Sequence, residues 1–199
     1  MKRKKMIKNK MKTIILSAAL TATSLLADIS DYEFKTKSLV GIEGGFNVVD
    51  YVYNSANSPK SSNLASAGLK IGAETRDFRV FLSTRYLFDT GNEYDYIVTY
   101  GGEVQYKFNA SEVFNFYLGV NGGMANIRFT PPIGTYRTIT SPYFGGDMGT
   151  NIHLGDTMDL ELGARVMSIQ ETNTIDGIEY RFNNIITGYA SLIFKWQMD

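Results

Sequence analysis

The chain contains no cysteine, which excludes disulfides, lipid attachment through cysteine and cysteine-ligated metal sites. It has one histidine, His153, so any Ser-His-acid triad would depend on that residue. There are four prolines, and none interrupts the interior of a predicted strand. An apolar run long enough to form a membrane-spanning helix, about 20 residues, is also missing. The placement of the prolines therefore leaves the hydrogen-bond ladders of the predicted strands intact.

The N-terminus has the order of a secretory signal peptide. A lysine-rich segment precedes the short apolar run 14–20, and the small residue Ala27 follows. We therefore predict a signal peptide over 1–27, a periplasmic extension over 28–37 and a single domain over 38–199. Cleavage after Ala27 is expected to within a few residues, and Met6 or Met11 could be the true start.

Cleavage of the predicted signal peptide would also remove positive charge from the chain. Residues 1–27 hold seven of the 20 basic residues and none of the 20 acidic ones, which leaves 13 against 20 and a net charge of −7. An acidic mature chain weighs against nucleic-acid binding, for which a basic surface is expected.

Eight segments alternate apolar and polar residues. In a strand successive side chains point to opposite faces, so this alternation predicts strands with one apolar and one polar face. The last segment shows the pattern, with Ile186, Leu192 and Phe194 on one face and Thr187 and Lys195 on the other. The predicted strands cover 39–53, 65–75, 78–88, 95–108, 114–128, 142–154, 159–168 and 184–196.

The proposed apolar faces carry no charge in any of the eight strands. A lysine or arginine facing the middle of a bilayer destabilises a barrel by about 2–4 kcal/mol, so this absence fits contact with lipid. Short connections near 75–77, 109–112 and 155–158 alternate with longer ones at 54–63, 89–94, 130–141 and 169–183, the arrangement of bacterial outer-membrane barrels. We predict an all-β fold, an eight-stranded antiparallel up-and-down transmembrane barrel.

In these features the chain resembles the small eight-stranded outer-membrane barrels, such as the transmembrane domain of OmpA and OmpX. The resemblance covers nearly all of the mature chain and lies in architecture rather than in a specific motif. Members of the group often finish on an aromatic residue, whereas Trp196 is followed here by Gln197, Met198 and Asp199. It implies export to the outer membrane of a Gram-negative bacterium, contact with outer-membrane lipid and insertion by the barrel-assembly machinery.

Charged residues gather on the predicted inward faces. Because an eight-stranded barrel is only wide enough for side chains to fill, these charges must pair with one another. The short turns place Glu74 opposite Arg79 and Asp147 opposite Arg165. The predicted interior network comprises Glu43, Lys70, Glu74, Arg79, Arg85, Glu103, Lys107, Asp147, Glu161, Arg165 and Lys195.

His153 is not expected to be catalytic. Some barrels of this group are lipid-modifying enzymes, and the deacylase among them has a serine two residues after its histidine. Gly155 occupies that position here. We expect neither enzymatic activity, nor a cofactor, nor a metal site.

The favoured function is that of a non-enzymatic outer-membrane protein that supports envelope integrity or makes surface contacts, including contacts with an extracellular or host partner. Its surface contacts would come from loop residues Tyr136, Arg137, Glu179, Tyr180 and Arg181. A narrow porin-like channel and a soluble periplasmic lipocalin-like carrier are the alternatives. The carrier would require the apolar faces to point inward.

Overall fold

The computed structural model describes residues 36–53, 60–89, 94–129, 136–175 and 178–197. The predicted signal peptide and most of the predicted N-terminal extension lie outside these residues. All described regular structure is strand, in an all-β arrangement of eight elements. The strands are β1 (Lys37–Tyr53), β2 (Lys60–Glu74), β3 (Phe78–Asp89), β4 (Tyr94–Phe108), β5 (Phe114–Phe129), β6 (Arg137–His153), β7 (Met158–Ile175) and β8 (Ile178–Gln197).

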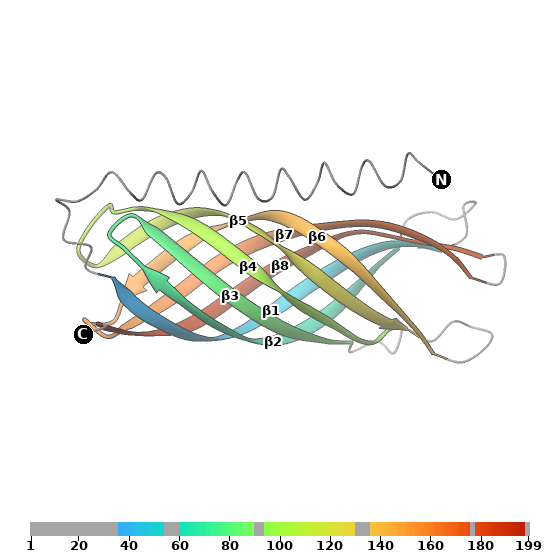
Figure 1. Ribbon diagram of the computed structural model, residues 1–199, viewed down its shortest axis with the longest axis horizontal. Coiled ribbons are helices and arrows are strands. Elements are labelled where there is room, and N and C mark those ends of the chain that lie inside the picture. The colour runs from blue at the N-terminus through green and yellow to red at the C-terminus, as the bar shows by residue number, and fades with distance from the viewer. Residues whose placement is uncertain (1–35, 54–59, 90–93, 130–135, 176–177, 198–199) are drawn as a thin grey trace, which may run out of the picture. The chain divides into compact units, whose positions relative to one another are not determined.

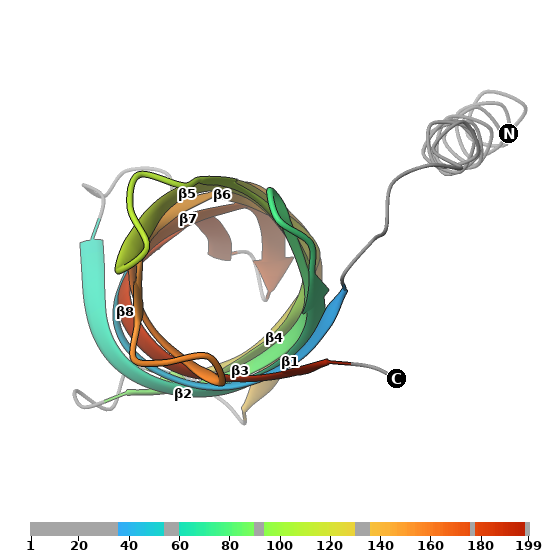
Figure 2. The ribbon, with the colours of Figure 1, turned by 90° about the vertical axis from the view of Figure 1, so that its left-hand side faces the viewer.

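The strands form one closed antiparallel barrel in chain order, which confirms the predicted fold class. Each strand pairs with its sequence neighbours, and β1 closes the ring by pairing with β8 from Lys37–Gln197 to Tyr53–Tyr180. Figure 1 shows the tilted strands from the side, and Figure 2 shows the ring viewed along its axis.

The two ends of the barrel differ. Three short connections join β2 to β3, β4 to β5 and β6 to β7 at the end where β1 begins and β8 finishes, and we call this the turn end. We call the opposite end, where the other four connections lie, the loop end. Register shifts in β1, β4 and β7 all lie near the loop end. Such bulges are common at the rims of barrels.

The predicted long connections are wrong in length, because the strands continue into them. Residues 60–63 belong to β2, 137–141 to β6, and 169–175 and 178–183 to the β7–β8 hairpin. Of the residues predicted in surface loops, only Tyr136 precedes a strand. Arg137 starts β6, whereas Glu179, Tyr180 and Arg181 lie in β8.

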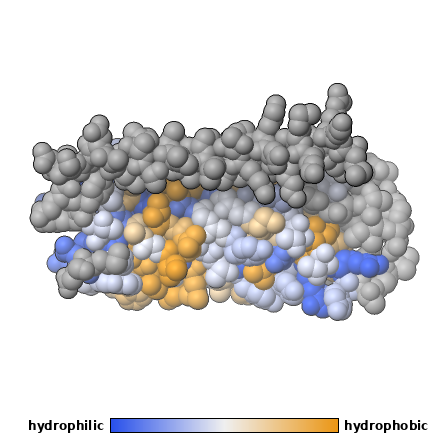
Figure 3. All heavy atoms as spheres, in the orientation of Figure 1, coloured by the Kyte–Doolittle hydropathy of each residue, from blue (hydrophilic) through white to orange (hydrophobic). Residues whose placement is uncertain are grey.

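The apolar faces point outward along all eight strands. Leu82, Val120 and Phe144 are 64–67% exposed although they lie in the middle of strands. Contact with the hydrocarbon core of a membrane accounts for this exposure, because apolar patches of such extent are rare on soluble monomers. Figure 3 shows a large group of hydrophobic side chains in the left-hand half of the visible face, pale residues of intermediate hydropathy beside it and hydrophilic ones near both ends. We call the outward-facing apolar residues of the strands the apolar belt.

None of the described residues forms a helix long and apolar enough to cross a membrane.

Candidate functional site: the charged barrel interior

All eleven charged residues predicted to face inward are buried in the barrel. The structure adds a twelfth, Asp159, which lies at the start of β7 and is also buried. With it, the buried charges of the described chain comprise six carboxylates and six cations: Glu43, Glu74, Glu103, Asp147, Asp159 and Glu161 against Lys70, Arg79, Arg85, Lys107, Arg165 and Lys195. The interior is therefore neutral when every group is ionised.

Glu43 on β1 is the centre of one of two ion clusters, which Glu161 on β7 connects by pairing with Lys70 at 2.9 Å and with Arg79 at 3.7 Å. The Glu43 carboxylate lies 3.0 Å from Lys70 Nζ, 2.7 Å from Arg85 Nε and 3.0 Å from Arg165 Nη1. Glu103 on β4 pairs with both arginines, at 3.3 Å from Arg165 Nη2. This central ion cluster joins β1, β2, β3, β4 and β7 across the barrel.

Aromatic rings lie beside the central cluster. The Arg165 guanidinium carbon lies 4.2 Å from the centroid of the Tyr189 ring, and Lys70 Nζ lies 5.1 Å from both the Tyr189 and Phe81 centroids. Cation–π attraction adds to ion pairing when the cation is removed from water. The Tyr189 and Tyr117 hydroxyls are 2.7 Å apart and connect β8 to β5.

A second ion cluster lies toward the turn end. Arg79 Nε lies 2.8 Å from Glu74 Oε2, and Arg79 Nη2 donates to Asp159. Lys107 Nζ lies 3.1 Å from Glu74, and Lys195 Nζ lies 2.7 Å from Asp159. Glu74 and Arg79 are also cross-strand partners in the β2–β3 register, as the short turn between them predicts.

Asp147 and Arg165 are likewise cross-strand partners, but their side chains diverge. Arg165 reaches Glu43 and Glu103, whereas Asp147 accepts hydrogen bonds from Gln105 Nε2 at 2.8 Å and from Asn121 Nδ2 at 3.5 Å. The predicted ion pair is therefore replaced by amide donors. Arg165 instead bonds to two carboxylates, Glu43 on β1 through both terminal nitrogens and Glu103 on β4, which gives it more charge-assisted hydrogen bonds than Asp147 alone could accept.

His153 closes a ring of hydrogen bonds with the turn-end cluster. Arg79 Nη1 donates to Asn151 Oδ1 at 2.6 Å, and Asn151 Nδ2 donates to Asn115 Oδ1 at 2.8 Å. The amide nitrogen of Asn115 can only donate, so His153 Nε2 accepts at 3.2 Å. His153 Nδ1 then donates to Asp159 at 2.7 Å, and Asp159 accepts from Arg79. Both ring nitrogens are thus engaged in structural hydrogen bonds.

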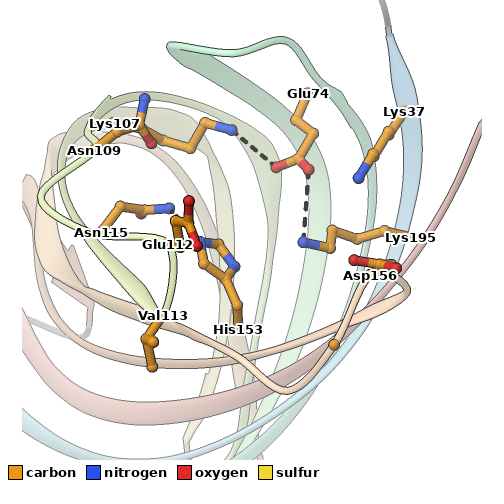
Figure 4. Close-up of a pocket in the computed structure, with 11 residues that line it drawn as sticks. Lys37, Glu74, Lys107, Asn109, Glu112, Val113, Asn115, His153, Asp156 and Lys195 are labelled. Atoms are coloured by element: carbon orange, nitrogen blue, oxygen red, sulfur yellow. Dashed lines mark hydrogen bonds and ion pairs between the residues drawn. The ribbon is translucent and has the colours of Figure 1, made fainter.

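A polar vestibule of about 390 Å³ opens at the turn end of the barrel and is lined in part by His153 and Asn115 of this hydrogen-bonded ring. Figure 4 shows Lys107 and Lys195 pointing toward Glu74 from opposite sides, with Lys37 nearby. Its lining carries both signs of charge, including Glu112 and Asp156. No group of three or more metal-ligating side chains occurs among the residues that the structure describes.

The loop half of the interior is largely apolar, with only uncharged polar residues such as Ser62, Thr99 and Ser141 buried among the apolar ones, and the sequence analysis did not predict this. Thirteen buried residues from all eight strands pack into one cluster, which we call the apolar plug: Val49, Leu64, Leu87, Ile97, Ala125, Ile127, Phe129, Ile139, Tyr143, Met167, Ile169, Phe182 and Ile185. The buried charges thus lie in the turn half of the interior, and the loop half is uncharged and mostly apolar. The sequence does indicate this apolar region. Leu64, Leu87 and Ile97 lie an even number of residues from the charged residues of their own strands, so they belong to the same inward faces.

Several solved structures of bacterial surface and outer-membrane proteins are similar to this chain. Neisserial surface protein A is similar with a TM-score of 0.63 and 17% identity, covering 79% of this chain and 97% of that one. OprG from Pseudomonas aeruginosa has a TM-score of 0.53 at 13% identity, covering 83% and 98%. Ail, the attachment invasion locus protein of Yersinia pestis, has a TM-score of 0.51 at 13% identity, covering 81% and 99%.

No protein-family profile matches the chain, and no curated protein sequence does. The structural likenesses show the fold. This chain has the fold of the small eight-stranded outer-membrane barrels, as its resemblance to them implies.

Proposed function

We propose that the protein is a closed, non-enzymatic barrel of the Gram-negative outer membrane that holds its loop-end strands at the cell surface. The observation that carries this proposal is the pairing of an apolar belt outside with a neutral, ion-paired interior. A soluble lipocalin-like carrier needs the reverse arrangement, with the apolar faces turned toward a ligand cavity.

The orientation follows from the two ends. In barrels of this type the periplasmic ends of the hairpins stay close to the membrane, while those outside the cell reach farther from it. The turn end, with the vestibule and the ends of β1 and β8, is therefore periplasmic. The loop end, where strands such as β7 and β8 continue beyond the belt, is extracellular.

The apolar plug argues against the alternative of a narrow channel. A path for ions would have to cross 13 packed apolar side chains whose exposed fractions are 9% or less. Transferring an ion into such surroundings costs many kcal/mol when nothing pairs with it. On the turn-end side of the apolar plug, six buried carboxylates balance six buried cations, so no net charge is left there to attract a passing ion.

Two measurements on the full chain test the proposal. Expressed protein is expected in the outer-membrane fraction, with an electrophoretic mobility that changes on boiling. Purified protein in a planar bilayer is expected to show no conductance steps, whereas an Ile127→Ser substitution in the plug is expected to introduce brief openings. Steady conductance of the unmodified protein would favour the channel instead, and recovery as soluble periplasmic protein would refute the barrel orientation.

A further inference from the structure

The outward face of β5 changes from apolar to polar near the loop end. Its apolar positions run from Phe114 to Met124, and Asn126 and Arg128 follow. Ten residues of strand are about 33 Å long, which a tilt of about 40° reduces to about 25 Å, the height of the apolar band of such barrels. Arg128 then lies about 10 Å beyond Met124, at the level of the lipid headgroups.

Arg128 is held in place by aromatic rings. Its guanidinium carbon lies 3.7 Å from the centroid of the Tyr136 ring and 5.6 Å from that of Tyr96, and the side chain is 31% exposed. Stacking of this kind fixes the plane of the guanidinium group, which lowers the entropy lost when it binds a ligand. An arginine at this depth is therefore positioned rather than flexible.

Other polar groups surround Arg128 on the same outward face. Thr138 is its cross-strand partner on β6, and Thr140 Oγ1 donates to Asn126 Oδ1 at 2.6 Å one step closer to the belt. We call Tyr96, Asn126, Arg128, Tyr136, Thr138 and Thr140 the headgroup patch. The patch combines one fixed cation with hydroxyl and amide groups, the donors that phosphate oxygens accept from.

The carboxylate of Asp95 would compete with a bound phosphate for Arg128. Its Oδ2 lies 3.3 Å from Arg128 Nε, and its side chain is 41% exposed. Exposed ion pairs contribute at most about 1 kcal/mol, so a phosphate with its higher charge can compete for the same guanidinium.

We propose that the headgroup patch binds a phosphate monoester carried by a lipid of the outer leaflet. The inference rests on the proposed function, because only insertion with the loop end outward brings Arg128 to that leaflet. The depth of the patch favours a lipid as the source, since acyl chains lying on the apolar belt would bring the phosphate to Arg128.

The test uses the full chain refolded in detergent micelles and titrated with lipid A, followed by native mass spectrometry. Phosphorylated lipid A is compared with enzymatically dephosphorylated lipid A, and inorganic phosphate is added as a competitor. We expect Arg128→Gln to weaken binding of phosphorylated lipid A about fivefold to tenfold, the loss of one charge-assisted contact. Binding of the dephosphorylated lipid should not change.

Arg76→Gln is the matched control, because it removes the same charge from the exposed turn between β2 and β3. It is expected to bind like the unmodified protein, and Arg128→Lys is expected to fall between the two. Equal binding by Arg128→Gln and the unmodified protein would overturn the proposal. Displacement of the lipid by equimolar inorganic phosphate would assign the site to free phosphate instead.

Failure of the proposed function would be seen separately. In that case the protein would lack the boiling-dependent mobility shift and would not enter vesicles, whatever phosphate their lipids carry.

Discussion

At the scale of single residues, Glu43 has the most ion-pair partners in the central cluster. Three cations from three strands lie within 3.0 Å of its carboxylate. Replacing one member of a buried ion cluster leaves its partners uncompensated, which destabilises a protein by about 3–5 kcal/mol. Glu43→Gln is therefore expected to lower the free energy of unfolding by that amount, measured by urea titration of the refolded barrel in vesicles.

Glu112→Gln is the control for this experiment. Glu112 lies exposed in the turn before β5 and borders the vestibule. Its replacement is expected to change the unfolding free energy by less than about 0.5 kcal/mol. A similar loss in both variants would mean that the central ion cluster is not what stabilises the interior.

At the scale of elements, the contact between β6 and β7 depends on Gly145. A Cβ atom built there would lie 1.8 Å from the carbonyl oxygen of Val166 on β7, so no side chain fits without parting the strands. Gly145→Ala is expected to destabilise the barrel by about 2–3 kcal/mol, as overpacking of a close contact does. Gly188→Ala on β8 is expected to be tolerated, because nothing lies within 4 Å of its Cβ position.

The same unfolding titration compares the two glycine variants. Since both exchange glycine for alanine inside a strand, intrinsic propensity cancels and the difference reports the strand contact. Equal stabilities would show that β6 and β7 can separate at this point without loss.

Alternation along the chain predicted all eight strands, but it missed their ends beyond the belt. There the pattern inverts: Ile139 faces the plug, while Thr138 and Thr140 face outward. Outside the membrane a polar outer face is favoured, so the rule that identified lipid-facing strands no longer applies. The alternation placed eleven charged residues on the inward faces, and all eleven are buried. It missed Asp159, which lies at the edge of a predicted strand.

Partner choice in the interior could not be predicted from neighbouring strands. Arg165 lies beside Asp147 in the register, yet it bonds to Glu43, which is 122 residues away in the sequence. That contact exists only once the barrel has closed, so local pairing rules carry no information about it. Short-range pairs such as Glu74 and Arg79, which a single turn brings together, follow those rules.

At the scale of the whole molecule, the absence of cysteine makes the orientation directly testable. Val120→Cys places a thiol in the apolar belt and Ala110→Cys places one in the turn between β4 and β5. In intact cells, neither thiol is expected to react with a charged, membrane-impermeant maleimide. After the outer membrane is permeabilised, Ala110→Cys is expected to react fully and Val120→Cys to stay protected.

Serine-to-cysteine substitution at Ser111, which neighbours Ala110 in the same exposed turn, serves as a second reporter for the periplasmic side. Labelling of either turn position in intact cells would reverse the proposed orientation. Labelling of Val120→Cys in permeabilised cells would show that the belt is in contact with water.

The position of Glu43 on the first strand has a consequence for how the protein is made. Lys70 and Arg85 lie on β2 and β3, but Arg165 lies on β7 and Ser191, which also donates to Glu43, lies on β8. The full set of contacts therefore forms only when nearly the whole chain has arrived. A half-assembled ring would present unmatched arginines and lysines to the hydrocarbon, where each is strongly disfavoured. Docking of the last strand would thus complete the charge balance of the interior. We therefore expect assembly to proceed without long-lived partial barrels in the bilayer.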